Sequence, residues 1–122
     1  MKLTLDCSLI NNEILDNEKS KQAAGIVYLL EFDLEGKKLV KVGMTFRRVE
    51  DRVCEILVSI WKRYRIFPQC YVKRYKTCSN PQKMEKQLHK QLYQYKYKTL
   101  YSFSGSTEFF EIDLVSAVSA YD

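Results

Sequence analysis

Long apolar runs are missing from this sequence of 122 residues. No stretch approaches the roughly 20 consecutive apolar residues that a membrane-spanning helix needs. The first residues, MKLTLDCSLINNE, also lack the continuous apolar region of a secretory signal. We therefore expect an intracellular protein without a membrane partner.

The cysteine and histidine spacing of a zinc site is missing too. The four cysteines, Cys7, Cys54, Cys70 and Cys78, form no C-x-x-C pair, and the chain has only one histidine. A structural zinc site is therefore not expected. Cys54 falls on the apolar side of a predicted helix, which favours buried, reduced thiols.

Internal repeats and low-complexity tracts are also lacking, and the length suits one domain with a single modest core. We expect that domain to span residues 25–122. Residues 1–24 would form an N-terminal extension, either an extra element docked on the domain or a partly disordered arm. We assign no chemistry to the extension.

Acidic residues are almost absent from the middle of the chain. Residues 61–98 contain eleven lysines and arginines and one acid, Glu85, which gives this segment a net charge of +10. Residues 99–122, in contrast, contain four acids and no base. Because tyrosines alternate with the basic residues, the segment suits a phosphate backbone. A solvated basic surface with inward-packed tyrosines explains the composition equally well.

Two strands joined by a tight turn are predicted near the start of the domain. Residues 25–33, GIVYLLEFD, are rich in β-branched and aromatic residues, and 34–37, LEGK, fit a hairpin turn before a return strand made by Leu39, Val40 and Val42. We expect Gly43 to end the return strand and Thr45 to cap a helix. In that helix, apolar residues recur at helical spacing up to Tyr64.

A third strand is predicted over QCYVKRYKT, residues 69–77, which would pair with the hairpin. Simple alternation would place the even-numbered residues on one face of the sheet and the odd-numbered ones on the other. The first set is Cys70, Val72, Arg74 and Lys76, and the second is Tyr71, Lys73 and Tyr75.

Two further helices follow from their start signals. Asn80 suits an N-cap and Pro81 the first turn of a helix that runs to about Tyr93. Asp113 would cap a short terminal helix, LVSAVSAY. These elements predict an α+β fold with a small central antiparallel three-stranded sheet flanked by helices.

The order of three motifs resembles the GIY-YIG endonuclease superfamily. These are Gly25-Ile26-Val27-Tyr28, Lys41-Val42-Gly43-Met44-Thr45 and Arg52, in the form of the viral and phage branch, which carries Lys-x-Gly as its second motif. That branch also has a Glu-x-x-x-His helix, matched by Glu85 and His89, and a late Glu-Phe-Phe, matched by residues 108–110. The resemblance covers about residues 25–114 and implies a GIY-YIG-like fold.

The resemblance implies a metal-dependent endonuclease that hydrolyses DNA phosphodiester bonds. Such a reaction needs a proton acceptor for the attacking water, a cation beside the phosphate and a carboxylate for a divalent metal. Tyr28, Lys41, Arg52 and His89 would be the catalytic residues, and Glu85 would hold a single Mg²⁺ or Mn²⁺. If the protein is viral, it would work inside the host cell.

Each role has a chemical reason. Tyr28 would act as general base or orient the water, and since phenol has a pKa of about 10, we expect Lys41 on the paired strand to lower it. The planar guanidinium of Arg52 fits a phosphate through two parallel hydrogen bonds. Glu85 would bind Mg²⁺ while water fills the other positions. Glu108 is an alternative supporting group.

The five residues also have ordinary structural explanations. Tyr28 would be core packing, Lys41 a strand-end lysine, Arg52 a partner of Glu55, and Glu85 and His89 surface residues. The sequence alone leaves these explanations open.

Two departures from the better studied members motivate a second hypothesis. Ile56 stands four residues past Arg52, where many members have His or Tyr, and a late asparagine that supports the metal has no counterpart. The second hypothesis is a catalytically weakened GIY-YIG fold that acts as a DNA-binding or protein-interaction module and modulates a host machine. A third is an unrelated RNA-binding protein whose tyrosines stack on unpaired bases.

The expected partner is nucleic acid, with DNA favoured over RNA, and the sequence makes no prediction of oligomeric state. Because no DNA-recognition appendage is attached, substrate choice would depend on DNA shape or on partners. The basic residues expected to contact nucleic acid are Arg47, Arg48, Lys62, Arg63, Lys73, Arg74, Lys86 and Lys90.

Overall fold

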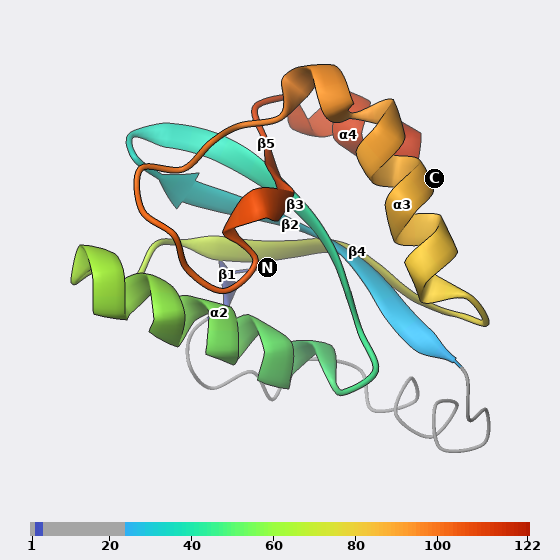
Figure 1. Ribbon diagram of the computed structural model, residues 1–122, viewed down its shortest axis with the longest axis horizontal. Coiled ribbons are helices and arrows are strands. Elements are labelled where there is room, and N and C mark those ends of the chain that lie inside the picture. The colour runs from blue at the N-terminus through green and yellow to red at the C-terminus, as the bar shows by residue number, and fades with distance from the viewer. Residues whose placement is uncertain (1, 4–23) are drawn as a thin grey trace.

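An antiparallel sheet separates one helix from two others in the computed structural model, which describes residues 2–3 and 24–122 (Figure 1). The predicted N-terminal extension lies almost entirely outside the described residues. The elements are β1 (Lys2–Leu3), β2 (Gly25–Leu34), β3 (Lys37–Thr45), α2 (Val49–Tyr64), β4 (Cys70–Cys78), α3 (Pro81–Gln91), the 3₁₀ turns η1 (Tyr93–Tyr95) and η2 (Ser106–Glu108), β5 (Phe109–Phe110) and α4 (Leu114–Tyr121).

The strand order in the sheet is β1-β4-β2-β3-β5, and every pairing is antiparallel. The predicted α+β class, an antiparallel sheet flanked by helices, is confirmed. The three predicted strands are the long central ones, β4, β2 and β3. Two strands of only two residues, β1 and β5, extend the sheet at its edges.

The β2–β3 hairpin turns at Glu35 and Gly36, which both have positive φ, 56° and 72°. Such a turn matches the twist of the paired strands. The prediction that Gly43 ends β3 is wrong, because the strand continues to Thr45. Gly43 pairs with Tyr28, and a Cβ at position 43 would lie 2.6 Å from Tyr28 Cζ and closer still to the hydroxyl oxygen. The glycine therefore makes room for the tyrosine ring.

A β-bulge interrupts the pairing of β2 with β4. Leu29 pairs with Arg74 but Leu30 pairs with Val72, so Lys73 is the extra residue. The predicted simple alternation along this strand is therefore wrong: Val72 and Tyr75 pack on the same core, the one that α2 covers.

The first long helix has the predicted residues but a different start. The residue before α2 is Arg48, whose side chain makes no capping hydrogen bond. The expectation that Thr45 caps α2 is wrong; its Oγ1 instead accepts a hydrogen bond from Arg47 N at 3.0 Å within the connecting turn. The predicted caps of the other helices are confirmed, since Asn80 accepts from Lys83 N and Asp113 from Ser116 N.

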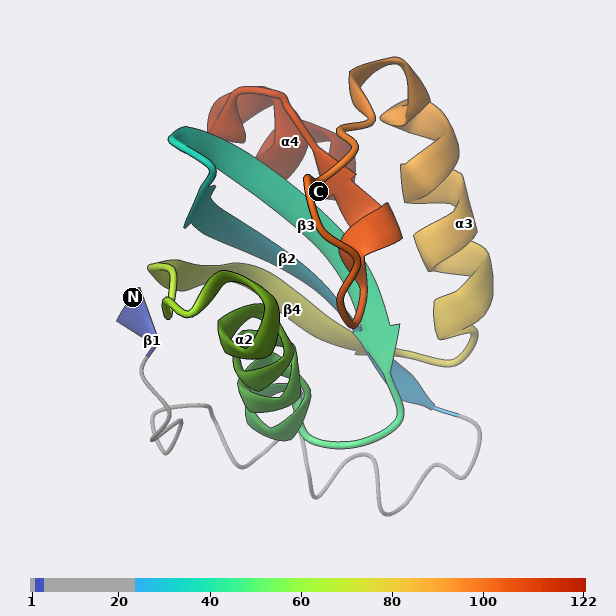
Figure 2. The same ribbon diagram turned by 60° about the vertical axis from the view of Figure 1, so that its left-hand side comes forward.

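The sheet has an apolar core on each face. Ile26, Leu30 and Phe32 pack with the apolar side of α2 on one face, whereas Val27 and Leu29 pack with α3 and α4 on the other. Figure 2 shows this arrangement, with α2 on one side of the sheet and α3 and α4 on the other. Each large apolar side chain that is fully buried contributes roughly 1.5–3 kcal/mol. Among the described residues, no helix combines the length and the apolar character needed to cross a membrane.

Candidate functional site

Five polar side chains from five different elements gather beside β3. Tyr28 comes from β2, Lys41 from β3, Arg52 from α2, Glu85 from α3 and Glu108 from η2. The charges of Arg52, Glu108 and Glu85 all act on the Tyr28 hydroxyl, and the same three charges act on the Lys41 ammonium. We call these five residues the polar cluster.

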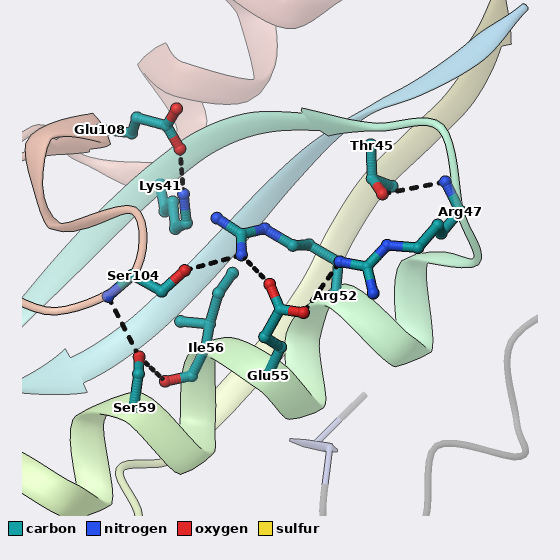
Figure 3. Close-up of polar contacts among 9 residues, drawn as sticks. All are labelled: Lys41, Thr45, Arg47, Arg52, Glu55, Ile56, Ser59, Ser104 and Glu108. Carbon is teal, nitrogen blue, oxygen red and sulfur yellow. Dashed lines mark hydrogen bonds and ion pairs between the residues drawn. The ribbon is translucent and has the colours of Figure 1, made fainter.

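Lys41 lies at the centre of the cluster and is completely buried. Its ammonium forms an ion pair with Glu108 (Figure 3). The same nitrogen lies 5.7 Å from the centroid of the Tyr28 ring and 5.9 Å from that of Phe109. Burial lowers the pKa of Lys41, and the neighbouring Glu108 opposes this effect. Lys41 is therefore buried inside the protein, whereas the ordinary structural explanation expected an exposed lysine near the end of a strand.

Arg52 is fixed from two sides. Its Nη1 donates a hydrogen bond to Ser104 Oγ at 2.7 Å and forms an ion pair with Glu55 (Figure 3). Glu55 also accepts from Arg47 Nη2 at 2.9 Å. The Glu55 pair expected from the ordinary explanation thus exists, and the Ser104 contact adds a link to the loop between η1 and η2. With 17% of its side chain exposed, Arg52 still reaches the surface.

The loop that supplies Ser104 is tied down to α2. Ser104 N donates to Ser59 Oγ at 3.2 Å, and Ser59 Oγ donates to Ile56 O at 2.7 Å. The next residue, Gly105, has a φ of 78°, and a Cβ there would lie 2.6 Å from Lys41 Nζ. Sequence reasoning missed Ser104 and Gly105. Gly105 lies in a segment rich in aromatic residues, 95–106, and a glycine in such a segment can indicate that another group approaches the backbone closely.

Tyr28 is buried at the bottom of the cluster. Its hydroxyl lies near the Arg52 guanidinium but has no hydrogen-bond partner of good geometry in the described part of the chain. Burial raises the pKa of Tyr28 well above its ordinary value, Arg52 opposes this, and Glu108 adds to it. The expectation that Lys41 lowers this pKa is therefore wrong: the cation that acts on the hydroxyl is Arg52, and burial outweighs it.

Glu85 approaches the cluster from α3 and is partly buried. Burial raises the pKa of Glu85, and the negative charge of Glu108 raises it further, whereas His89, Lys41 and Arg52 act in the opposite direction. Glu85 also lines an open cavity of about 940 Å³ together with three lysines of α3. These are Lys83, Lys86 and Lys90.

His89 anchors α3 to the sheet. Its Nε2 lies 2.7 Å from Val42 O, and its ring meets that of Phe110 edge-on, with centroids 5.3 Å apart. Since a carbonyl oxygen only accepts, Nε2 carries the hydrogen and Nδ1 is the nitrogen left to exchange a proton. The predicted role of His89 in proton transfer remains a prediction, and the anchoring role was missed.

The carboxylates of the cluster suit a hard cation with few protein ligands. No group of three or more His, Cys, Asp or Glu side chains converges in residues 2–3 and 24–122. Mg²⁺ is commonly held by only one or two carboxylates, with water and substrate phosphate in the other positions. Glu85 and Glu108 are the two carboxylates of the polar cluster that could serve as such ligands, and the charge of Glu108 acts on Glu85.

The eight basic residues expected to bind nucleic acid fall into two groups. Half of them already pair with carboxylates: Arg47 with Glu55, Arg48 with Glu50, Lys73 with Glu31 and Arg74 with Asp122. The other half, Lys62, Arg63, Lys86 and Lys90, form no ion pair within the described chain.

Two residues of the second group share a cavity with a member of the polar cluster. Lys86 and Lys90 line the cavity that contains Glu85. Lys62 and Arg63 lie in the last turn of α2, and Arg63 stacks on Tyr101 with its Cζ 5.7 Å from the ring centroid. Arg74 lies on the opposite side of the sheet from α2, paired with Asp122 after α4.

Comparison with known proteins identifies the chain at the level of a family. Residues 25–122 match the model of the T5orf172 domain. No curated protein and no solved structure matches the chain. The division of the chain into an extension and a domain stays a prediction, and so does a GIY-YIG type of chemistry. The chain belongs to the T5orf172 domain family, a phage-associated family of nuclease-like or DNA-binding modules.

Proposed function

We propose that the protein is a metal-dependent endonuclease that hydrolyses DNA phosphodiester bonds with a site of the GIY-YIG type. One observation carries the proposal: Tyr28, Lys41, Arg52, Glu85 and Glu108 come from five elements and form one electrostatically coupled cluster. A cluster of two carboxylates and two cations has groups suited to both the metal and the phosphate in such a reaction.

Arg52 binds the phosphate in this proposal. Its guanidinium reaches the surface and is oriented by Ser104 and Glu55. A guanidinium presents parallel N–H groups to two phosphate oxygens and keeps its charge at every relevant pH. It therefore neutralises the negative charge that accumulates on the phosphate as the bond to the leaving oxygen breaks.

Glu85 would hold Mg²⁺ or Mn²⁺, with Glu108 as the neighbouring carboxylate. When bound, the metal supplies positive charge to a phosphate oxygen as a Lewis acid. The raised pKa of Glu85 reflects burial and negative charge, both of which a bound cation offsets.

Tyr28 and Lys41 act from beneath the exposed groups. Because burial keeps the pKa of Tyr28 high, the phenol stays protonated at neutral pH and serves as a hydrogen-bond donor or orienting group. Lys41 holds Glu108 in place through its ion pair. Of the two predicted proton acceptors, His89 through Nδ1 is therefore better suited than a Tyr28 phenolate.

The test is cleavage of supercoiled plasmid and of branched DNA by the purified chain with Mg²⁺ or Mn²⁺. We expect nicking by the wild type and a loss of about 100-fold or more in rate for Glu85→Gln and for Arg52→Lys. Asp33→Asn is the matched control, since Asp33 pairs with Lys38 on the hairpin away from the cluster. Nicking that survives both cluster substitutions would rule out this site.

A second function is favoured by the enclosure of two proposed catalytic groups. Neither Tyr28 nor Lys41 exposes any surface, which suits a DNA-binding module with little or no turnover. That function predicts salt-sensitive DNA binding by the wild type and by Glu85→Gln, without nicking in any metal. Metal-stimulated nicking by the wild type would exclude it.

A further inference from the structure

A second hollow lies inside the loop between η1 and β5. It is a cavity of about 490 Å³, within the roughly 300–1,000 Å³ that small-molecule sites occupy. Its lining includes Lys96, Lys98 and Tyr93 together with hydroxyl groups from Ser102, Ser106 and Thr107. We call it the loop cavity.

The side chains that line the loop cavity carry a net positive charge. No acidic residue lines it. The nearest acids in sequence are already paired, since Glu108 binds Lys41 and Glu111 binds Lys37 at 3.0 Å. The side chains of Lys96 and Lys98 form no ion pair or hydrogen bond with the described part of the chain. Two ammonium groups beside several hydroxyl donors form a site for an anion with many oxygen acceptors, such as a phosphate group.

The walls of the loop cavity are held in place. Tyr97 N donates to Phe109 O at 2.9 Å, and Glu111 N donates to Tyr95 O at 2.8 Å. The Tyr97 hydroxyl donates to Glu35 at 2.6 Å. These bonds connect one wall to β5 and to the β2–β3 hairpin, so a ligand meets a framework that is already formed.

The loop cavity is adjacent to the polar cluster in the chain. Ser106 and Thr107 line it, and the next residue of η2, Glu108, pairs with Lys41. The cavity lined by Glu85 and the α3 lysines also borders the cluster. Of the two lysine-lined hollows, the one on α3 therefore contains a cluster residue, Glu85, and the loop cavity is lined by the two residues that precede Glu108 in η2.

We propose that the loop cavity binds a backbone phosphate and its sugar from the same nucleic-acid strand that the polar cluster contacts. Lys96 and Lys98 neutralise the phosphate, the hydroxyl groups of the lining bind its oxygens, and the exposed ring of Tyr93 lies alongside the flanking nucleotide. The proposal rests on the proposed function for one point only, that the neighbouring phosphate lies at Arg52 and Glu85. It adds a binding position on the η2 side of that phosphate.

The first test measures DNA binding without cleavage, in EDTA. Fluorescence anisotropy with a labelled single-stranded oligonucleotide gives the association constant at several salt concentrations. In a plot of its logarithm against the logarithm of the salt concentration, the magnitude of the slope decreases by about 0.7 for each phosphate that the protein no longer neutralises. We expect Lys96→Ala with Lys98→Ala to reduce the slope by about 0.7, because the loop cavity holds one phosphate. Lys38→Ala with Arg74→Ala is the control of equal charge, because both side chains are exposed and pair with acids away from the loop cavity, Lys38 with Asp33 and Arg74 with Asp122. Equal slopes in the two double variants would overturn the proposal.

The second test varies the length of the strand. Wild-type affinity should rise with each added nucleotide until both the cluster and the loop cavity are filled. The Lys96→Ala, Lys98→Ala variant should stop gaining affinity at a shorter length. A length dependence that is identical in the two proteins would overturn the proposal.

Competition with dTMP and inorganic phosphate separates a strand from a free ligand. Binding of dTMP that the double variant loses, with strand affinity unchanged, would assign the loop cavity to a free nucleotide and overturn the proposal. The nicking assay tests the proposed function separately. If the wild type never nicks DNA but the salt slopes and the length dependence are as expected, the proposal for the loop cavity stands and the proposed nuclease function is rejected.

Discussion

The ammonium group of Lys41 pairs with the carboxylate of Glu108, and none of the lysine side chain is exposed. The two residues lie on β3 and η2, far apart in the sequence. Burial makes an ammonium costly unless it is paired, so the pair joins the sheet to the loop that carries Ser104 and Gly105. This relationship makes the polar cluster sensitive to the loss of either charge.

Glu108→Gln should therefore destabilise the protein by about 3 kcal/mol, since it leaves the charged Lys41 buried without its partner. Replacing both residues, Lys41→Met with Glu108→Gln, should recover most of that loss. Urea denaturation at neutral pH measures both changes. A double variant as unstable as Glu108→Gln alone would show that the pair is not what matters.

Glu85→Gln should raise stability at neutral pH while it abolishes nicking. Since the pKa of Glu85 is raised on folding, the folded chain binds its proton more tightly, and this stabilisation is lost as pH rises through the folded pKa. The ionised side chain is thus unfavourable at neutral pH, and a neutral amide removes the cost. Thermal unfolding at pH 7 and pH 4 checks this: the gain should shrink at the lower pH. A lower melting temperature at pH 7 would contradict it.

Gly43→Ala should cost about 1–3 kcal/mol because the new Cβ collides with the Tyr28 ring. In a Tyr28→Leu background the same substitution should cost less, and denaturation of the four proteins gives the coupling. Additive effects would contradict the close approach of the two residues.

Glu35→Gln should loosen the loop that frames the loop cavity. Glu35 accepts hydrogen bonds from Tyr64, from Tyr97 at 2.6 Å and from Leu100 N at 2.7 Å. Because a charged acceptor binds more strongly than a neutral one, we expect a loss of about 1 kcal/mol at neutral pH. Burial raises the pKa of Glu35, but the three hydrogen bonds lower it by more, so the pKa lies below its usual value of 4.5. The stabilisation is therefore complete above pH 4.5 and lost as pH falls through the folded pKa. Wild type and variant should thus converge in denaturation curves at low pH, and a constant gap would count against this.

Lys86→Ala with Lys90→Ala should weaken DNA binding more than Arg74→Ala. The two lysines border the cavity of Glu85 without an ion pair, whereas Arg74 is paired with Asp122 across the sheet from α2. The salt slope for duplex DNA should fall by about 0.9 per lysine that contacts a phosphate. If Arg74→Ala reduces DNA affinity as much as each of the two lysine substitutions does, this ranking is refuted.

The sequence was most informative where the signal is local. The hairpin turn at Glu35 and Gly36 and the caps Asn80 and Asp113 depend on residues within one turn of each other, so their chemistry is readable directly from the chain. The residues of α2 followed from helical spacing in the same way.

Features that depend on packing between distant segments were not predictable. The bulge at Lys73 and the continuation of β3 past Gly43 depend on side chains from a neighbouring strand. In the polar cluster, the order of motifs led to Tyr28 and Arg52, but the Ser104 contact joins residues 52 positions apart and left no local signal. The direction of the Tyr28 pKa followed burial, which only the folded chain reveals.

The close fit between Gly43 and Tyr28 also constrains how this domain diverges. A larger residue at position 43 would collide with the buried ring of Tyr28. Such a substitution is therefore tolerated only if a smaller residue replaces Tyr28 before it or at the same time. We expect the two sites to change together among descendants of this chain, as a linked pair on adjacent strands.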